Sequence, residues 1–130
     1  MNILIIDDDN RICLYVSYIL KVMYKDYKDF NIQTANDCEG SLEIILNTSN
    51  PPLDAPVDLI ITDYHLLRDT ATTCLGRLYD LGYKGKVIIM TGDKTKDRES
   101  LGNLRFEGIL YKPFDAKGIV KILKEVGCLE

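Results

Sequence analysis

Short apolar runs alternate along this chain with longer stretches whose apolar residues recur at helical spacing. Four runs are clear, at residues 3–6, 59–62, 87–90 and 108–111, and a weaker one lies at 32–35. This alternation is typical of repeated βα units, which build a parallel sheet. Right-handed crossovers then place helices on both of its faces. We therefore predict an α/β fold, a doubly wound sheet of five parallel strands alternating with five helices in a three-layer sandwich.

Helix boundaries are marked by residues that commonly cap or end helices. Asp37 fits the start of a second helix, and Gly82 fits the end of a third, in the left-handed conformation that glycine adopts readily. Asp115 and Gly127 bracket the last helix in the same way. Residues 94–106 are mostly polar, and we expect a short or mobile fourth helix there.

Each clear run ends in side chains that can do chemistry. In an open parallel sheet, ligands bind beyond the carboxyl ends of the strands, so these endings should gather at one rim. Acids, a hydroxyl and an amine together suit a magnesium ion and a phosphoryl group. The endings are Asp7-Asp8-Asp9, Asp63, Thr91-Gly92 and Lys112-Pro113.

The three consecutive aspartates allow two interpretations. They could form a solvated acidic turn that caps the first helix, since acids are favourable at helix N-termini. They could instead hold a cation, because Mg²⁺ prefers carboxylate oxygens and relieves the repulsion between adjacent carboxylates. His65 is the only histidine, and a lone histidine after a strand-end acid favours a loop residue beside the site over a metal ligand.

Asp63 also allows two interpretations. As a strand-end acid it could simply cap the following loop. As a nucleophile it would accept a phosphoryl group and form an aspartyl phosphate. Such transfer depends on positioning and on neutralising charge at the phosphoryl oxygens. Magnesium held by Asp8 and Asp63 would supply part of that charge. Lys112 and Thr91 could bind two phosphoryl oxygens, and Gly92 leaves room for the backbone to approach.

Length and charge narrow the possible functions. The chain has 130 residues, and we expect residues 1–130 to form a single domain. It carries 16 basic and 20 acidic residues, and the net charge of −4 argues against direct nucleic-acid binding. No stretch reaches the length of a membrane span, and no signal peptide precedes Asp7. We therefore expect a cytoplasmic protein with neither nucleic acid nor membrane as a partner.

The cysteines form no C-x-x-C pair. A chain of this size does not need covalent staples, so we expect reduced and mostly buried thiols in a cytosolic protein. The four are Cys13, Cys38, Cys74 and Cys128.

The strand-end motifs together resemble the receiver domain of bacterial two-component response regulators. The matching elements are Ile-Ile-Asp-Asp-Asp at 5–9, Thr-Asp-Tyr at 62–64, Met-Thr-Gly at 90–92 and Tyr-Lys-Pro-Phe at 111–114. Each is weak alone, but their order and strand-end placement make the set specific over nearly the whole chain. The resemblance implies a flavodoxin-like (CheY-like) sheet with strand order 2-1-3-4-5.

The resemblance also implies a metal site. Asp8 corresponds to a direct magnesium ligand, Asp63 to a second, and Asp7 to a ligand that acts through water. The backbone carbonyl of His65 corresponds to a further ligand. Mg²⁺ is the implied cofactor, and Mn²⁺ would suit the same oxygens.

For the phosphoryl group, Asp63 corresponds to the phosphoacceptor, Thr91 to the switch hydroxyl and Lys112 to the phosphate-binding lysine. The bond from Lys112 to Pro113 is similar to one that is often cis in the family. The implied donor is a histidine kinase or histidine phosphotransfer protein. A downstream protein would read the surface of the fourth helix, fifth strand and last helix. Such a domain promotes its own phosphorylation and slow dephosphorylation and is not an enzyme in the usual sense.

The chain departs from the family pattern at several places. The proline that often follows the phosphoacceptor is missing from residues 65–68, so that loop is expected to be less rigid. Ile109 stands where the family has a rotating aromatic, and a branched aliphatic side chain cannot make that movement. The stretch between the first and third strands is longer than usual because of residues 24–30 and 50–56. The second of these ranges contains three prolines, which preclude a helix there.

Three functions follow from these patterns. The first is a phosphorylation-driven binding switch, a stand-alone regulator or phosphorelay intermediate, in which His65 and Asp93 tune the lifetime of the phosphate. The second is a haloacid-dehalogenase-type phosphatase with Asp7 as nucleophile and Asp9 as acid/base, although no Gly-Thr follows Asp9. The third is a degenerate receiver that binds partners without phosphate.

Overall fold

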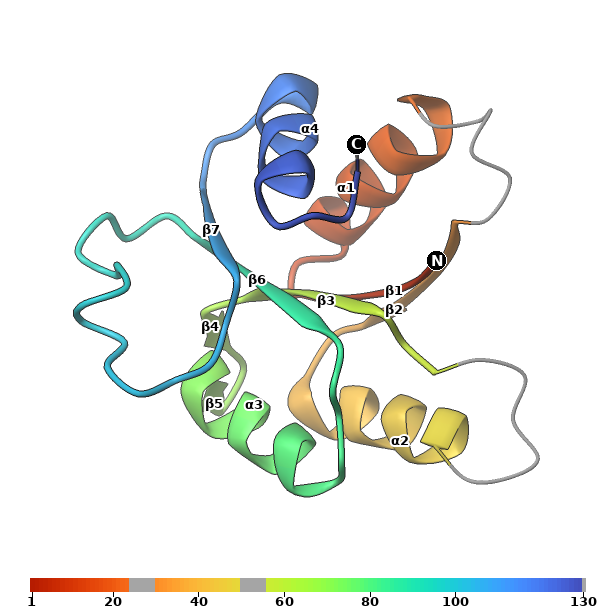
Figure 1. Ribbon diagram of the computed structural model, residues 1–130, viewed down its shortest axis with the longest axis vertical. Helices are drawn as coiled ribbons and strands as arrows, with labels where there is room; N and C mark the ends of the chain where they lie inside the picture. The colour runs from red at the N-terminus through yellow and green to blue at the C-terminus, as the bar shows by residue number, and fades with distance from the viewer. Residues whose placement is uncertain (24–29, 50–55, 130) are drawn as a thin grey trace.

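The computed structural model describes residues 1–23, 30–49 and 56–129, and a five-stranded parallel sheet lies at its centre (Figure 1). The spatial order β2-β1-β3-β6-β7 places the second strand at one edge and the fifth strand of the sheet at the other. The predicted fold class and strand order are therefore confirmed. The strands are β1 (Asn2–Ile6), β2 (Asn31–Ala35), β3 (Leu59–Asp63), β6 (Lys86–Thr91) and β7 (Gly108–Tyr111).

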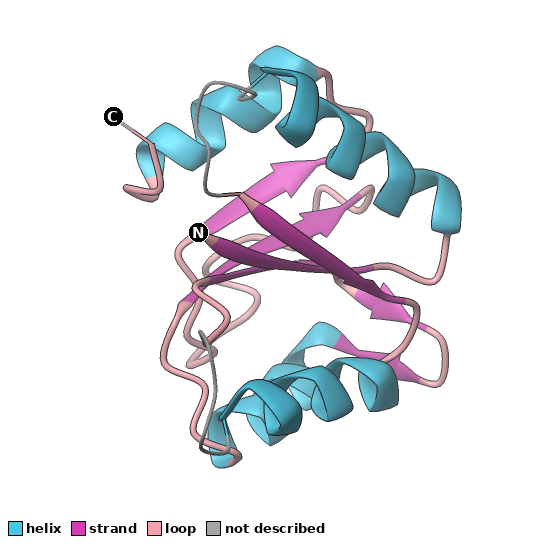
Figure 2. Ribbon diagram, turned by 90° about the vertical axis from the view of Figure 1, so that its right-hand side faces the viewer, coloured by secondary structure: helices cyan, strands magenta, loops and turns pink. Residues whose placement is uncertain are grey.

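Helices cover both faces of the sheet and complete the three layers (Figure 2). On one face lie α1, Asn10–Met23, and α4, Ala116–Glu125; on the other lie α2, Cys38–Ser49, and α3, Ala71–Asp80. This is the arrangement that right-handed crossovers predict for consecutive parallel strands.

The strands serve two separate cores because successive side chains point to opposite faces. In β1, Ile3 and Ile5 pack toward α1 and α4, whereas Leu4 and Ile6 pack toward α2 and α3. β3 is buried along its whole length, as expected for a central strand covered on both sides. Packing on both faces therefore holds the carboxyl ends of the central strands at one rim.

The predicted helix boundaries are confirmed. The Asp37 carboxylate accepts a hydrogen bond from the backbone N–H of Gly40 at 2.7 Å, and Asp115 accepts one from Gly118 at 2.9 Å. Gly82 and Gly127 have φ values of 97° and 79°, the left-handed conformation that a helix-ending glycine supplies.

The predicted fourth helix is not formed, so the described part of the chain has four α-helices instead of five. Residues 92–107 instead form turns between β6 and β7. Asp97 and Ser100 bind each other's backbone N–H groups through their side chains, at 2.8 and 2.9 Å. Such local bonds compete with helical ones. Arg98 donates to the carbonyl of Phe106 at 3.0 Å and ties the segment to its own end.

A short antiparallel pair, absent from the sequence prediction, follows β3. It consists of β4, His65–Leu66, and β5, Asp69–Thr70, with Arg68 in the left-handed region at φ 63°. The N–H of Ala71 donates to the carbonyl of Tyr64 at 2.7 Å and closes the base of this hairpin. Backbone hydrogen bonds thus organise the loop that lacks the family's proline.

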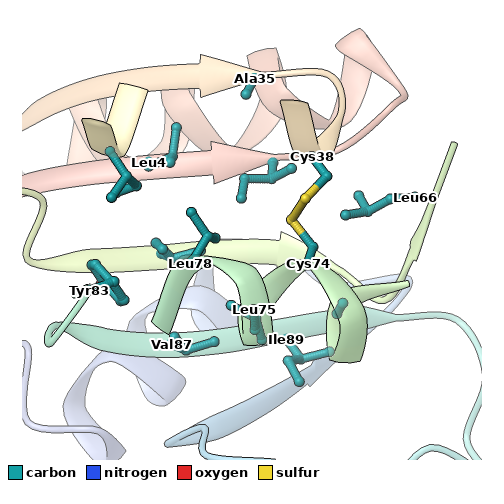
Figure 3. Packing of buried hydrophobic residues seen from close by; sticks show 14 of the residues in the cluster. Leu4, Ala35, Cys38, Leu66, Cys74, Leu75, Leu78, Tyr83, Val87 and Ile89 are labelled. Carbon is teal, nitrogen blue, oxygen red and sulfur yellow. A yellow bond between two sulfur atoms is a disulfide. The ribbon is translucent and has the colours of Figure 1, made fainter. Parts of the chain in front are cut away.

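The expectation of four reduced cysteines is wrong for two of them. Cys38 and Cys74 form a disulfide between α2 and α3 (Figure 3). Their sequence separation of 36 residues conveys no pairing signal, but both helices begin on the same face of the sheet and bring the two Cα atoms to 5.7 Å. Cys13 and Cys128 are free thiols, as expected.

The two segments expected to lengthen the chain between the first and third strands lie largely outside the described residues. Only Phe30 of residues 24–30 and only Pro56 of residues 50–56 are described. Among the helices of the described ranges, none combines the length and the apolar character that crossing a bilayer requires.

Two glycine substitutions should have opposite effects on stability. A Cβ on Gly108 would lie 2.7 Å from Cδ1 of Ile122 and 3.0 Å from Cγ1 of Val126, both on the helix that packs over β7. Gly108→Ala should therefore lower the free energy of unfolding by about 1–3 kcal/mol.

The matched control is Gly76, which lies within α3 and has open space around its Cβ position. Gly76→Ala should raise the free energy of unfolding by about 0.5–1 kcal/mol, because alanine loses less backbone entropy in a helix. Urea denaturation of both variants measures the difference. Similar values for the two variants would contradict the close packing of α4 on β7.

Candidate functional site

Three carboxylates meet at the carboxyl ends of β1 and β3. These strands are neighbours in the sheet, with Ile6 paired to Thr62, so Asp7 and Asp63 emerge side by side. One oxygen from each of Asp7, Asp8 and Asp63 lies within 4.8 Å of the others. Asp7 is fully buried, Asp63 is nearly so, and Asp8 is exposed. The predicted acidic cluster is therefore assembled by the fold.

Lys112 reaches this cluster from the end of β7. Its Nζ lies 3.0 Å from Oδ2 of Asp7 and 3.2 Å from Oδ1 of Asp63. The backbone N–H of Lys112 donates to the carbonyl of Thr91 at 2.8 Å, and the Lys112–Pro113 bond is cis, as the resemblance implies. One ammonium thus contacts two carboxylates that the sequence places far from it.

Burial dominates the electrostatics of these groups. Desolvation raises the pKa of Asp7, although hydrogen bonds from Asp9 and Lys112 work against that rise. Desolvation and the negative charge of Asp7 raise the pKa of Asp63, against the pull of Lys112. Burial alone would lower the pKa of Lys112, but its contacts with Asp7 and Asp63 raise it overall. The site therefore favours additional positive charge.

The carboxylates fit a small divalent cation. Asp7 already accepts from the Asp9 N–H through Oδ1, at 2.9 Å, and from Lys112 through Oδ2. Asp8 is solvent-exposed, whereas Asp63 is only 8% exposed, so Asp8 is the carboxylate of the cluster most open to a cation. Hard carboxylate oxygens with room for water are the environment that Mg²⁺ prefers.

Thr91 lies at the carboxyl end of β6, between the strands that supply Asp63 and Lys112. It is fully buried, and its Oγ1 accepts from the N–H of Asp93 at 3.0 Å. Asp93 in turn accepts from the N–H and hydroxyl of Thr95, and these bonds lower the pKa of Asp93. The hydroxyl and the turn after it are thus structurally linked.

His65 begins the hairpin that follows Asp63. Its side chain is exposed, and its ring packs edge-on against Tyr64 with centroids 5.0 Å apart. Its exposed imidazole thus packs on a half-buried tyrosine, which agrees with a loop residue beside the site. Metal binding by its backbone carbonyl stays a prediction.

Three contacts near the site were not predicted from sequence. Arg11 pairs with Asp9, with Nη2 3.0 Å from Oδ2, and this pairing lowers the pKa of Asp9. Lys96 lies over the Tyr64 ring, with Nζ 4.8 Å from its centroid, and its carbonyl accepts from the Tyr111 hydroxyl at 2.7 Å. The i, i+2 spacing of Asp9 and Arg11 could have indicated their ion pair from the sequence. The two contacts of Lys96 depend on how residues 92–107 fold.

Comparison with known proteins agrees with this geometry. The family model described as "Response regulator receiver domain" matches residues 3–124. A search of curated proteins found no significant match.

Solved structures of several receiver domains have the same fold. The chain is 19% identical to a receiver domain protein from Clostridium thermocellum, with a TM-score of 0.74, covering 98% of this chain and 94% of that one. It is 22% identical to a CheY-like receiver domain protein from Methanospirillum hungatei JF-1, with a TM-score of 0.75 and coverage of 95% and 90%. The receiver domain of NtrX from Brucella abortus is 19% identical, with a TM-score of 0.75 and coverage of 98% and 99%.

The raised pKa of Asp63 predicts a pH-dependent effect of removing its charge. A carboxyl whose folded pKa lies above the ordinary 3.8 stabilises the fold while protonated, and that contribution is lost as the pH rises through the folded value. In buffer with a metal chelator, Asp63→Asn should therefore be more stable than the wild type at pH 7. This difference in stability should disappear below pH 3.8, where the Asp63 carboxyl is protonated in both the folded and the unfolded wild type.

Urea denaturation across this pH range measures the effect. Glu99→Gln removes one exposed negative charge away from the cluster and should show little change at any pH. A wild type that is more stable than Asp63→Asn at neutral pH without metal would contradict the assigned direction.

Proposed function

Because the chain belongs to the response regulator receiver domain family, we propose that it accepts a phosphoryl group on Asp63, in a Mg²⁺-dependent reaction, and acts as a binding switch. The donor would be a histidine kinase or a histidine phosphotransfer protein. The observation that carries this proposal is the ammonium of Lys112, which contacts both Asp7 and Asp63 at the edge of a carboxylate cluster.

The proposed chemistry uses Asp63 as the nucleophile. A carboxylate oxygen of Asp63 forms a bond to phosphorus while the bond from phosphorus to the donor imidazole nitrogen breaks, and the imidazole keeps that electron pair. Lys112 would bind one phosphoryl oxygen, and the Thr91 hydroxyl would bind another. Burial of Asp63 limits its exposure to solvent, which favours a defined approach of the donor.

The cation site would use oxygens of the three-carboxylate cluster. Asp8 and Asp63 would bind Mg²⁺ directly, Asp7 through water, and His65 through its backbone carbonyl. The two hydrogen bonds of Asp7 to Asp9 and Lys112 support an indirect role for its carboxylate. When bound, the cation neutralises negative charge on the carboxylates and phosphoryl oxygens, and Mn²⁺ could replace it.

We further propose that residues 1–130 form one receiver domain in the cytoplasm. Its downstream protein partner would bind the surface formed by residues 92–107, β7 and α4. Ile109 is half-buried on β7 and packs with the core beside α3, so this switch would operate without an aromatic rotation. The net charge of −4 argues against a direct nucleic-acid partner.

The phosphatase alternative is less compatible with the local contacts. It needs Asp9 as a general acid, but Arg11 pairs with Asp9 and lowers its pKa. It also needs Asp7 as the nucleophile, whereas both oxygens of Asp7 accept hydrogen bonds from the protein. A phosphate-independent module would have no need of the buried ion pair of Lys112 with Asp7.

Intact mass measured after incubation with acetyl phosphate and Mg²⁺ tests the proposal. The wild type should gain one phosphoryl group, which should be absent without Mg²⁺ and absent in Asp63→Asn. Glu99→Gln should be modified like the wild type.

The alternatives give different results in the same assay. Donor hydrolysis that survives Asp63→Asn and is lost in Asp7→Asn would identify the phosphatase. Failure of modification, both with acetyl phosphate and with a panel of phosphorylated kinases, would identify the phosphate-independent module.

His65 and Asp93 should set the lifetime of the phosphate. His65 lies two residues beyond Asp63, and the N–H of Asp93 bonds to the hydroxyl of Thr91. His65→Ala and Asp93→Ala should each change the rate of dephosphorylation by about threefold or more, a modest change in the barrier. Loss of the phosphoryl group followed by intact mass measures the rate. Rates equal to that of Glu99→Gln in both variants would exclude this role.

A further inference from the structure

The Cys38–Cys74 disulfide joins the first turns of α2 and α3 next to the hairpin that follows β3 (Figure 3). Both sulfurs belong to a core that already contains large aliphatic side chains from the strands and both helices. Leu66 of the hairpin is part of the same cluster and lies beside the pair. The disulfide therefore joins α2 and α3 beside the hairpin that follows Asp63.

The two sulfurs have different surroundings. Cys38 lines a pocket of about 330 Å³ together with Leu67, Arg68 and Arg77. Cys74 faces inward, and its Sγ lies 3.6 Å from the buried hydroxyl of Ser41. Both residues are buried, 3% and 1% exposed, but Cys38, unlike Cys74, lines this pocket, so a small molecule that enters it would meet Cys38 first.

Two features place positive charge close to the Cys38 sulfur. Nη1 of Arg77 lies 4.0 Å from its sulfur, and Cys38 is the first residue of α2, where the helix dipole is positive. Both features stabilise a thiolate. Asp37, Glu39 and Asp69 line the same pocket and oppose this effect. Glu39 and Asp69 also pair with Arg77, at 2.9 and 4.0 Å, so each ion pair offsets charge on both of its partners.

From this asymmetry we propose that Cys38 and Cys74 form a reversible dithiol–disulfide centre in which Cys38 exchanges with low-molecular-weight disulfides and thiols. This role is separate from phosphorylation, since it requires neither Asp63 nor a cation.

The exchange balances in two steps. The Cys38 thiolate attacks one sulfur of the small disulfide, forms a mixed disulfide and releases one thiolate. The Cys74 thiol then loses its proton and attacks Cys38, which forms the protein disulfide and releases the second thiolate. Two protein thiols are oxidised, and one small disulfide is reduced to two thiols.

Cysteine reactivity in the reduced protein tests which thiol exchanges. After reduction with dithiothreitol and its removal, iodoacetamide at pH 7 and peptide mass mapping give the alkylation rate of each cysteine. Cys38 should react about tenfold or more faster than Cys74. Cys13 is an internal reference, because burial and the charge of Asp7 raise its pKa to about 11.

Arg77→Gln tests the source of the reactivity. It should slow alkylation of Cys38 severalfold and leave Cys13 unchanged. Arg105→Gln is the matched control, because Arg105 is equally exposed, 46% against 45%, and also pairs with a glutamate. Circular dichroism confirms that each variant is folded, and the comparison of Cys38 with Cys74 in the wild type stands without either variant.

Reversibility is measured on the wild type with oxidised glutathione and then dithiothreitol, without denaturant. One disulfide should form and be reduced again, with Cys38 and Cys74 as its members. The proposal is overturned if the disulfide resists dithiothreitol in the folded protein, if four thiols persist with oxidised glutathione, or if Cys38 reacts no faster than Cys74. Phosphorylation of the same samples by acetyl phosphate reports separately on Asp63.

Discussion

The contact of one ammonium with two buried carboxylates is the interaction on which the rest of this site depends. Asp7 and Asp63 are forced together because β1 and β3 are neighbours, and their burial makes two adjacent negative charges costly. Lys112 crosses the rim from the edge strand β7 and offsets part of that repulsion. The remaining negative charge, exposed at Asp8, is what would attract the proposed cation.

The same arrangement would accommodate the proposed phosphoryl group with only a change of partners at Lys112. In the unmodified protein, the ammonium has carboxylate oxygens as partners. A phosphoryl group on Asp63 would bring new anionic oxygens into the same space, so Lys112 could exchange one anionic partner for another. The Thr91 hydroxyl is held in place by the turn that begins at Asp93, which connects any movement at the phosphate to residues 92–107.

The strand pattern predicted the sheet and the rim because period, burial and strand-end chemistry are all local features that parallel topology then brings together. The strand order followed from the resemblance to receiver domains. Two predictions failed for different reasons, one because of local hydrogen bonds and one because of a contact between distant segments. Residues 94–106 were judged by composition, yet their side chains bind the local backbone instead of supporting a helix. Cys38 and Cys74 meet only because α2 and α3 begin side by side, and no spacing rule could have paired them.

The ion pair at the rim joins residues 105 positions apart, nearly the whole length of the chain. During synthesis, the first strand and its aspartates leave the ribosome long before the lysine that neutralises them. An incomplete chain could therefore present the acidic residues but not the pocket. Competence to receive a signal would coincide with completion of the fold, which would protect a signalling pathway from unfinished copies of its own components.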